Sequence, residues 1–472
     1  MSAVATQRRL LTVEEVARAT SGGFVVRGHG VAELTGVSID SRTLRPGELF
    51  VAIVGPRLDG HDFVAEAVAR GAAAILVQRE ISLPPGVDVL RVGDTTAALG
   101  RLASHVRQAS GLPVVCVTGS TGKTTTKEMA AALLAVLGPV LKSEGNLNNQ
   151  YGLPLTLFRL SPEHRAAVLE LGMSAPGELR ALASVARPDL AVITNVAPVH
   201  LEFFSSVDAI AQAKAEILEG LGPGGVAVLN GDDPRVRRIG EAFPGKAIWF
   251  GWDRRNEVSA EAWRGTLFGM RFVLRLGGRP YDAALPLAGR HFVANFMAAA
   301  AAAHRLGVAP EAILEAAAQL EPAPHRGRVL RLGGGVTLLD DSYNANPAAV
   351  EAAVAALALS PRGRRIAFLG DMLELGPDGP ELHRATGEKV APLLDAIAAV
   401  GPLAAHLLEG AERAGSSSSA FLRYPDSSAA AEEAPQIVRP GDAVLVKGSR
   451  GVRMERIVDA LVSHFGPGEG LG

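Results

Sequence analysis

Residues 118–125 read Thr-Gly-Ser-Thr-Gly-Lys-Thr-Thr, a combination of small, hydroxyl and lysine side chains that suits phosphate binding. The apolar run at residues 114–117 precedes this segment and predicts a buried strand. Residues 126–137 follow with a helical pattern that Gly138 ends. A strand, a glycine loop and a helix in this order are the context of a phosphate-binding loop. We therefore predict that residues 119–125 bind ATP.

The side chains of this loop have distinct predicted roles. Gly119 and Gly122 allow backbone N–H groups to turn toward phosphates, and the helix start adds a positive dipole. Lys123 can reach the β- and γ-phosphates, and the Thr124 hydroxyl can bind Mg²⁺. The spacing Gly-x-x-Gly-Lys-Thr is shorter than the usual pattern, so the alternative is a glycine turn with an unrelated lysine. The flanking strand and helix favour the first interpretation, with these ATP-binding residues: Gly119, Ser120, Thr121, Gly122, Lys123, Thr124 and Thr125.

Two possible metal ligands follow apolar strands. Glu170 lies within the strand-like residues 167–171, and His200 follows the strand-like residues 190–194. Ligands bind at the carboxyl ends of parallel strands, and a carboxylate there is well placed for Mg²⁺. The alternatives are a solvent-facing charge for Glu170 and a structural role for His200.

Lys214 and Asn295 lie on predicted helices. Lys214 belongs to the helical residues 209–220, where the alternative is a solvated surface lysine. Asn295 is expected to open an Ala-rich helix, where it can also act as a cap or packing residue.

The elements that must position these residues alternate between short apolar runs and amphipathic stretches, which predicts βα units on mainly parallel sheets. Two segments separate three blocks: Ala-Ser-Gly-Leu-Pro at residues 109–113 and Pro-Ala-Pro at residues 322–324. We predict a three-domain α/β protein. Its domains are residues 1–111, a central ATP-binding domain with a mainly parallel sheet at 112–322, and a Rossmann-like domain at 323–472.

Composition excludes several classes of protein. The 472 residues are 48% hydrophobic and 20% charged, as in folded globular chains. The net charge of -2 gives no basic excess for a nucleic-acid partner. The single cysteine, Cys116, excludes an intrachain disulfide and fits a reducing compartment. No apolar stretch suits a membrane span or a secretion signal, so we expect a cytoplasmic protein with no membrane partner.

Together these motifs resemble the Mur ligases of peptidoglycan synthesis along nearly the whole chain, most of all the MurF type. Five segments follow the phosphate loop in the order of that family: residues 145–149 (Gly-Asn-Leu-Asn-Asn), 170–172 (Glu-Leu-Gly), 200–202 (His-Leu-Glu), 212–216 (Gln-Ala-Lys-Ala-Glu) and 341–347 (Asp-Ser-Tyr-Asn-Ala-Asn-Pro). Residues 40–42 (Asp-Ser-Arg) and 59–63 (Asp-Gly-His-Asp-Phe) match the uridine-nucleotide domain of the MurE and MurF types. The MurE-type signature Asp-Asn-Pro-Arg is absent from the sequence.

The resemblance implies roles by position. The implied catalytic residues are Lys123, Glu170, His200 and Lys214. The implied metal ligands are Thr124, Glu170, His200 and Lys214 as a carbamate. Beyond the phosphate loop, the implied ATP contacts are Asn295, Arg326 and Asp341, and the implied substrate contacts are Ser41, Arg42, Asn146 and Asn149. Arg328 is the alternative to Arg326, and Phe292 stands where the family often has asparagine.

The reaction that this resemblance implies is ATP-dependent amide ligation through an acyl phosphate, with Mg²⁺ as the metal. It would add D-alanyl-D-alanine to UDP-N-acetylmuramoyl-tripeptide, and we expect a monomer. One alternative is another Mur-type ligase, or an amide ligase of the folylpolyglutamate or cyanophycin kind. The other is a nucleotide-gated switch protein, which would leave the uridine-type first domain unexplained.

Overall fold

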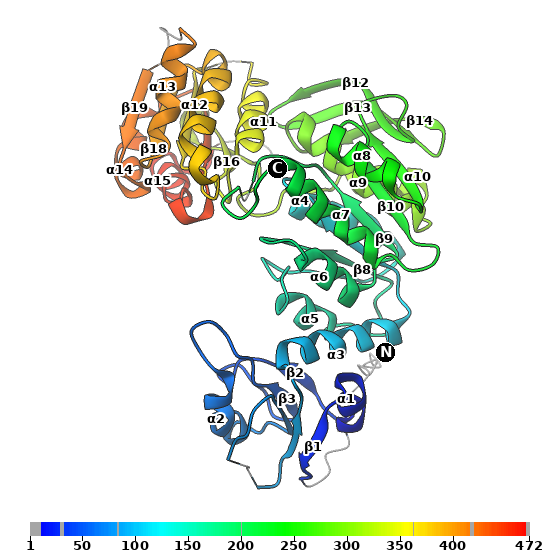
Figure 1. Ribbon diagram of the computed structural model, residues 1–472. Coiled ribbons are helices and arrows are strands. Elements are labelled where there is room, and N and C mark those ends of the chain that lie inside the picture. Colours follow the sequence, from blue (N-terminus) through cyan, green and yellow to red (C-terminus); the bar gives the residue numbers. More distant parts are fainter. Residues whose placement is uncertain are drawn as a thin grey trace, which may run out of the picture. The chain divides into compact units, whose positions relative to one another are not determined.

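A computed structural model describes residues 11–28, 33–82, 85–199, 201–361, 363–415 and 420–468. These residues form an α/β protein with sheets of five, nine and six strands (Figure 1). The predicted fold class, with three sheet-containing domains and mainly parallel strands, is confirmed. By contacts the chain divides into two compact units: Met1–Thr118, Leu137–Ala191 and Ala215–Val226 form the first, and Gly119–Val136, Val192–Lys214 and Ala227–Gly472 form the second. The boundaries drawn near residues 111 and 322 stay predictions.

The five-stranded sheet has the order β1-β5-β4-β3-β2. Its strands are β1 (Gly23–Val26), β2 (Gly36–Ser38), β3 (Glu48–Val51), β4 (Ala74–Val77) and β5 (Asp88–Arg91). Neighbours from β5 to β2 are parallel, so their carboxyl ends share one edge, and β1 is antiparallel to β5. The helices are α1 (Val13–Thr20), α2 (Val64–Ala69) and α3 (Thr95–Ser110). Asp94 caps the start of α3, which packs against this sheet (Figure 1).

The nine-stranded sheet has the order β14-β13-β12-β11-β10-β9-β6-β8-β7. Its strands are β6 (Val114–Thr118), β7 (Val140–Lys142), β8 (Ala166–Glu170), β9 (Leu190–Ile193), β10 (Val226–Asn230), β11 (Lys246–Gly251), β12 (Val258–Thr266), β13 (Gly269–Leu276) and β14 (Arg279–Leu285). The last three strands form an antiparallel meander that the sequence analysis did not predict. Gly277 and Gly278 join β13 to β14 with φ values of 59° and 78°, as a two-residue hairpin turn requires.

The helices of this part of the chain correct two details of the sequence analysis. They are α4 (Lys123–Leu134), α5 (Gly152–Leu157), α6 (Glu178–Ala186), α7 (Val207–Ala215), α8 (Pro234–Ala242), α9 (Arg290–Arg305) and α10 (Pro310–Ala317). Helix α4 begins at Lys123 rather than at Thr126, because Gly122 takes the left-handed conformation at the N-cap. Asn295 does not open its helix, since α9 starts at Arg290 and places Asn295 in its second turn.

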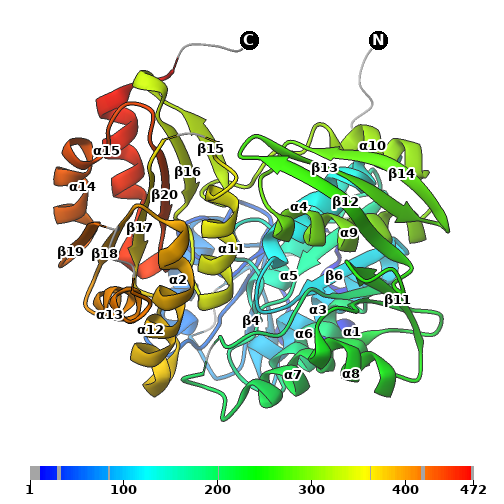
Figure 2. The same cartoon turned by 90° about the horizontal axis from the view of Figure 1, so that it is seen from above.

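The six-stranded sheet has the order β15-β16-β20-β17-β18-β19. Its strands are β15 (Arg328–Arg331), β16 (Thr337–Asp341), β17 (Arg365–Gly370), β18 (Ala396–Val400), β19 (Ala420–Tyr424) and β20 (Ala443–Lys447). All neighbours are parallel except the β15–β16 pair. Helices cover both faces (Figure 2): α11 (Pro347–Leu357), α12 (Gly379–Val390) and α13 (Ala405–Arg413) on one, and α14 (Ser427–Ile437) and α15 (Glu455–Phe465) on the other. This doubly wound arrangement is the predicted Rossmann-like fold.

Candidate active site

The phosphate loop has a shape that only glycine permits at two positions. Gly119 and Gly122 have φ values of 152° and 79°. A Cβ atom on Gly119 would lie 1.8 Å from Thr194 Oγ1, and one on Gly122 would lie 2.3 Å from Asn295 Oδ1. Both the backbone conformation and the space around it therefore exclude larger residues. Asn295, predicted as an ATP contact, is buried directly against the loop.

Side chains that follow β9 hold this loop in place. The Thr121 N–H donates to Asn195 Oδ1 at 2.9 Å, and the Ser120 hydroxyl donates to the Ala197 carbonyl at 3.1 Å. Lys123 Nζ donates back to the Gly119 carbonyl at 2.8 Å, so its ammonium lies over the loop. The first turn of α4 follows, and its dipole favours an anion at the same place. The loop is thus preformed for phosphate.

Lys214 differs from the two other deeply buried lysines of the second compact unit. Lys127 pairs with Glu128 at 2.7 Å, and Lys447 pairs with Asp341 at 2.5 Å. Lys214 on α7 is only 2% exposed, and no hydrogen bond or ion pair reaches its amine from the described residues. Burial, and then the charge of Lys123, lower the pKa of Lys214 well below its ordinary value. The solvated surface lysine considered from sequence is therefore excluded, and the lowered pKa favours the neutral form of the Lys214 amine.

Glu170 is also buried, which excludes the solvent-facing alternative. It ends β8 and is 4% exposed. Its Oε1 accepts a hydrogen bond from Asn148 Nδ2 at 3.0 Å, and its backbone N–H donates to Ser143 Oγ at 3.1 Å. Gly172 lies against the Asn148 amide, with room for no larger residue without displacement. The carboxylate is fixed in orientation by an amide that the sequence analysis did not select.

In the segment 145–149, Asn148 is the residue that contacts Glu170, whereas the sequence analysis selected Asn146 and Asn149 as substrate contacts. Asn146 is exposed, as is Asn149, whose Oδ1 accepts from the Tyr151 and Gly152 N–H groups at the start of α5. Asn149 therefore has a helix-capping task, and its substrate contact stays a prediction, as does that of Asn146. The Asn148–Glu170 hydrogen bond was missed because 22 residues separate the partners and no short motif links them.

Asp341 at the end of β16 forms an ion pair with a lysine that the sequence analysis did not select. Lys447 Nζ at the end of β20 donates to Asp341 Oδ2 at 2.5 Å and to the Asn344 carbonyl at 2.9 Å. The pairing follows from register, because Asp341 and Lys447 are aligned neighbours on parallel strands.

Burial lowers the pKa of His291 to about 4, although the Asp341 charge opposes this shift.

Arg326 lies on the segment between α10 and β15. Its guanidinium stacks 4.0 Å above the ring of Tyr343, and Arg450 lies 5.5 Å from the same ring. The neighbouring His325 has φ = 59°, and its Nδ1 contacts Asp340 Oδ2 at 2.9 Å. Arg328, the alternative to Arg326, begins β15 and is exposed. The structure therefore gives Arg326 a fixed aromatic support.

Phe292 stands where the Mur ligases often have asparagine, and its surroundings show what the phenyl ring does instead. A Cβ atom on Gly327 would lie 2.5 Å from the Phe292 ring, and Phe292 is buried. The phenyl ring thus packs beneath the segment that carries Arg326. An asparagine in its place would not fill this apolar space.

In the first sheet, the residues predicted for the uridine substrate follow β2 directly. Ser41 is buried and donates to Glu66 Oε2 at 2.9 Å. Arg42 forms two hydrogen bonds with Asp40, at 2.9 and 2.7 Å, and its side chain is 79% exposed. The Arg42 hydrogen bond outweighs burial and lowers the pKa of Asp40.

The described residues contain no group of three His, Cys, Asp or Glu side chains that could hold a metal ion. His200 lies outside the described residues, so its predicted metal role is not placed by the structure. The donor types taken singly suit Mg²⁺: Glu170 is a buried carboxylate, and Thr124 carries a hydroxyl in the first turn of α4. Lys214 is a buried amine with no anionic partner among the described residues.

Comparison with known proteins agrees with these features. The chain matches three domain families: the Mur ligase family catalytic domain at residues 33–107, the Mur ligase middle domain at 117–303 and the Mur ligase glutamate ligase domain at 325–450. It is 40% identical to UDP-N-acetylmuramoyl-tripeptide–D-alanyl-D-alanine ligase of Escherichia coli, over 91% of this chain and 94% of that protein.

Solved structures give the same result. A crystal structure of MurF from Acinetobacter baumannii superimposes with a TM-score of 0.89 at 33% identity, covering 97% of this chain and 99% of the other. MurF ligase from Thermotoga maritima in complex with ADP gives a TM-score of 0.82 at 31% identity, covering 91% and 97%. The chain therefore belongs to the Mur ligase family, in its MurF branch.

Proposed function

We propose that this chain is the ATP-dependent ligase that adds D-alanyl-D-alanine to UDP-N-acetylmuramoyl-tripeptide in peptidoglycan precursor synthesis. The observation that carries the proposal is the preformed phosphate loop with Lys123 folded over it and the buried amine of Lys214 nearby. Membership in the MurF branch gives the substrates, because the Escherichia coli relative is named for this pair.

The chemistry follows from the weakness of a carboxylate as an acylating agent. A terminal carboxylate oxygen of the tripeptide attacks the γ-phosphorus of ATP, and the bond from that phosphorus to the ADP oxygen breaks. The acyl phosphate then accepts the dipeptide amine at its carbonyl carbon, and inorganic phosphate leaves as the amide forms. The amine loses one proton in this step. The products are UDP-N-acetylmuramoyl-pentapeptide, ADP and phosphate.

The residues of this chain bind and orient the reactants. Lys123 exchanges its bond to the Gly119 carbonyl for phosphate oxygens and balances their charge. Arg326, held on Tyr343, and Asp341, held by Lys447, supply further ATP contacts in the second compact unit. Asn295 packs on the loop and is the proposed contact to the adenine end. Transfer of a phosphoryl group requires alignment and charge neutralisation more than covalent catalysis.

Mg²⁺ is the proposed metal, and when bound it neutralises phosphate charge and aligns the transferring group. Thr124 and Glu170 are its proposed oxygen ligands, His200 is a proposed nitrogen ligand, and Lys214 joins them as a carbamate. Lys214 supports this assignment because its buried amine has no carboxylate partner among the described residues. Its lowered pKa favours the neutral form, which is the form that reacts with CO₂. The carbamate is an anionic oxygen ligand of the kind Mg²⁺ prefers.

The remaining roles concern the UDP-linked substrate. Ser41 and Arg42 are its proposed contacts in the first domain, and Asn146 and Asn149 are proposed contacts nearer the peptide. We assign these roles to domains at residues 1–111, 112–322 and 323–472. No helix among the described residues has the length and apolar character of a membrane span. We further propose a monomer that acts in the cytoplasm, for which a single species of about 49 kDa in light scattering is the test.

The function is tested by ADP release coupled to product detection. We expect turnover only when both UDP-N-acetylmuramoyl-tripeptide and D-alanyl-D-alanine accompany ATP. Single amino acids, folate-type acceptors and ATP alone are the comparison arms. ADP release with ATP alone would indicate a nucleotide switch, and release with a different acceptor would indicate another amide ligase. No release with the proposed pair would overturn the assignment.

A further inference from the structure

A short hairpin extends from the first sheet at the edge where parallel strands end. Residues 54–59 follow β3, with Val54 and Asp59 bridged in an antiparallel pair. Gly60 N–H donates back to the Ile53 carbonyl at 2.7 Å, and a Cβ atom on Gly60 would lie 2.7 Å from the Ile53 nitrogen. The tip is solvent-exposed, with Leu58 at 68% exposure. Such a hairpin has almost no core of its own, so contacts at its base must hold it.

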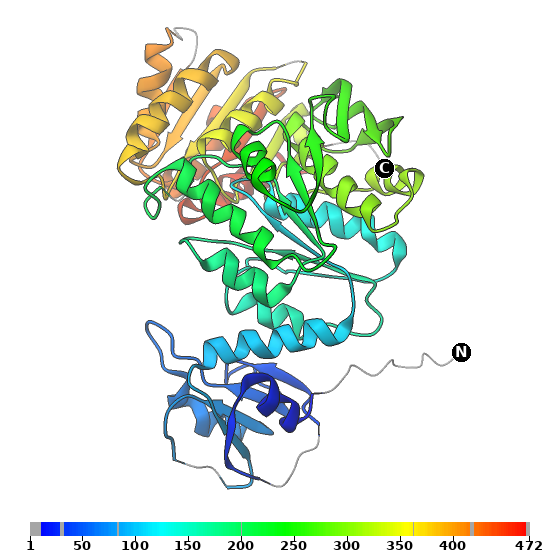
Figure 3. The ribbon, with the colours of Figure 1, turned by 45° about the vertical axis from the view of Figure 1, so that its right-hand side comes forward.

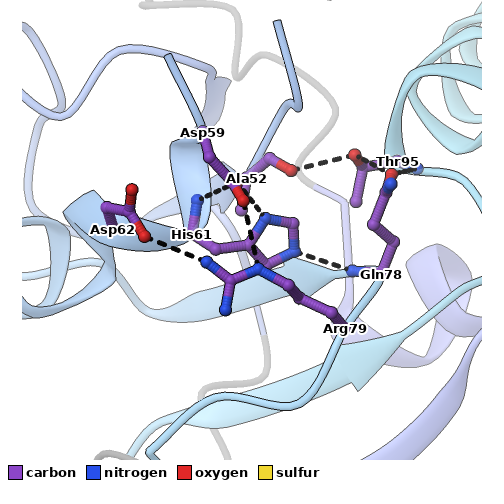
Figure 4. Close-up of polar contacts among 7 residues, drawn as sticks. All are labelled: Ala52, Asp59, His61, Asp62, Gln78, Arg79 and Thr95. Atoms are coloured by element: carbon purple, nitrogen blue, oxygen red, sulfur yellow. Dashed lines mark hydrogen bonds and ion pairs between the residues drawn. The ribbon is translucent and has the colours of Figure 1, made fainter.

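The base of the hairpin is held by His61, whose ring is fully buried (Figure 4). The Gln78 backbone N–H donates to His61 Nε2 at 3.0 Å. Nε2 is the acceptor in this contact, which leaves Nδ1 as the ring nitrogen that can donate. His61 Nδ1 then donates to Asp59 Oδ1 at 2.6 Å. The ring thus connects the end of β4 to the last residue of the hairpin.

Asp59 receives further donors that fix its carboxylate. The His61 backbone N–H donates to Oδ1 at 2.9 Å, and Arg79 Nε donates to Oδ2 at 3.1 Å. Burial alone would raise the pKa of Asp59, but these hydrogen bonds outweigh it and lower the pKa to about 2. Arg79 also binds Asp62 at 2.9 Å. Both oxygens of Asp59 are therefore engaged, and the carboxylate cannot rotate freely.

The same strand end anchors a second set of contacts. The Thr95 N–H donates to Gln78 Oε1 at 2.9 Å, and the Thr95 hydroxyl lies 2.9 Å from the Ala52 carbonyl. Thr95 begins α3, the light-blue helix beside the first sheet in Figure 3, and is fully buried. Gln78 and Arg79 at the end of β4 therefore join β3, the hairpin and α3 into one network (Figure 4).

The hairpin is the neighbour of the segment proposed to bind the uridine substrate. Strands β2 and β3 are parallel, with Ser38 aligned to Phe50. The chain after β2 carries Ser41 and Arg42, and the chain after β3 carries the hairpin, so both emerge at the same edge. The network has no catalytic group of its own, since every polar atom of His61 is used in holding backbone or Asp59.

We propose that His61 is a positioning residue for the UDP-linked substrate: it fixes the hairpin 54–59 beside residues 41–42 so that both sides of the binding site are formed before the substrate arrives. The inference rests on the proposed function and deepens it. Loss of the His61 contacts leaves the hairpin free to sample other conformations, and substrate binding must then restore one. The effect falls on affinity for the UDP-linked substrate rather than on the chemical step.

The test compares His61→Ala, His61→Asn and His61→Gln in the full-length protein. Asparagine can place an N–H near the Nδ1 position and keep the Asp59 contact, whereas glutamine can place an acceptor near the Nε2 position and keep the Gln78 contact. The matched control is Asp88→Ala. Asp88 is buried in the same sheet and accepts from Gly28 N–H at 2.8 Å, but it starts β5 at the opposite edge.

We expect His61→Ala to raise the KM for UDP-N-acetylmuramoyl-tripeptide by about tenfold or more. The KM for ATP, the KM for D-alanyl-D-alanine and kcat should stay within about twofold of wild type. His61→Asn should recover more of the affinity than His61→Gln, because it keeps the contact to the hairpin. Asp88→Ala should lower the thermal midpoint to a similar degree without this change in KM.

The outcomes separate positioning from general stability. An unchanged KM for the UDP-linked substrate in His61→Ala, or an equal rise in Asp88→Ala, would overturn the inference. If His61→Ala does not fold, the Asn and Gln variants and Asp59→Asn decide by the same KM comparison. Failure of the wild-type protein to use the UDP-linked substrate would instead overturn the proposed function, so the two failures are distinguishable.

Discussion

The phosphate loop after β6 and the hairpin after β3 are both ligand-binding candidates at the carboxyl end of a parallel strand, yet they are built in different ways. The loop takes its shape from the backbone: Gly119 and Gly122 adopt conformations and contacts that a Cβ would prevent. The hairpin takes its position from side chains, with His61 and Asp59 at the centre. The loop presents the N-terminal end of a helix dipole, which favours an anion, whereas the hairpin is held by a buried hydrogen-bond network.

This difference determines where each site is sensitive to change. An added Cβ atom at Gly119 or Gly122 would collide with its neighbours, whereas shortening Lys123 leaves both glycines and the hydrogen bonds of Ser120 and Thr121 in place. A side-chain network loses its geometry with one substitution, because each member holds the next. We therefore expect a side-chain substitution in the loop to lower the catalytic rate while the fold of the loop is kept. A substitution in the hairpin network should instead lower the affinity for the UDP-linked substrate.

The largest expected effect is that of Lys123→Ala. The substitution removes the charge that faces the phosphates but leaves both glycines, so the loop should keep its shape. We expect kcat for ADP release to fall by about 10³-fold, with an unchanged thermal midpoint. The control is Lys389→Ala, which removes an exposed lysine paired with Glu351 and should leave kcat unchanged. Equal activity of Lys123→Ala and wild type would contradict the role of the loop lysine.

Lys214→Ala tests whether ATP turnover depends on a carbamate at Lys214. We expect ADP release to fall by about 10²-fold or more, because an anionic metal ligand is lost. A short-chain carboxylate added in solution should restore part of the rate, and CO₂-depleted buffer should reduce the activity of the wild-type protein until bicarbonate is returned.

Lys127→Ala is the matched control for this rescue. Lys127 is equally buried but pairs with Glu128, so a carboxylate should give no recovery. Full activity of Lys214→Ala, or absence of rescue together with insensitivity to bicarbonate, would rule out the carbamate.

A comparison of Gly122→Ala with Gly111→Ala isolates the shape of the loop. Both glycines have left-handed φ values, 79° and 64°, so both substitutions carry a strain of about 1 kcal/mol. A Cβ on Gly111 meets no atom within 4 Å, whereas one on Gly122 would lie 2.3 Å from Asn295 Oδ1. Denaturant unfolding should show the larger loss of stability for Gly122→Ala, and the KM for ATP should rise in that variant alone. Equal effects of the two substitutions would show that the contact with Asn295 is unimportant.

The same contrast explains what could be read from sequence. The fold class and the strand–glycine loop–helix geometry at residues 114–134 were predictable, because glycine spacing and element order are local patterns. The ATP contacts of the loop stay a prediction. The carboxylate Glu170 was selected by its strand-end position, but its partner Asn148 was not, since 22 residues separate them. Lys447 and Tyr343, which support Asp341 and Arg326, are contacts that arise only from strand register and packing.

The hairpin network was invisible for the same reason. The segment 59–63 was noted as a match to a uridine-type domain. The Gln78 N–H that binds His61 lies 17 residues away, and the Ala52 carbonyl that binds Thr95 lies 43 residues away. The antiparallel meander of β12, β13 and β14 was missed because its alternating pattern was read within a run of βα units. Such features depend on tertiary contacts that no short window of sequence contains.

The smallest expected effect is the pH dependence of the hairpin base. The pKa of Asp59 is lowered to about 2, below its ordinary value of 3.8, so the unfolded chain binds a proton more readily than the folded one. The stabilisation is therefore present above about pH 4 and is lost as the pH falls through about 2. Asp59→Asn should reduce the free energy of unfolding at pH 7 by about 1–2 kcal/mol, and this difference should shrink as urea titrations are repeated at lower pH.

Asp62→Asn is the control, because Asp62 contacts Arg79 from a more exposed position and should cost under about 0.5 kcal/mol at every pH. Parallel curves for Asp59→Asn and wild type across this range would mean that the carboxylate is not held by the network, and the hairpin would then need another anchor.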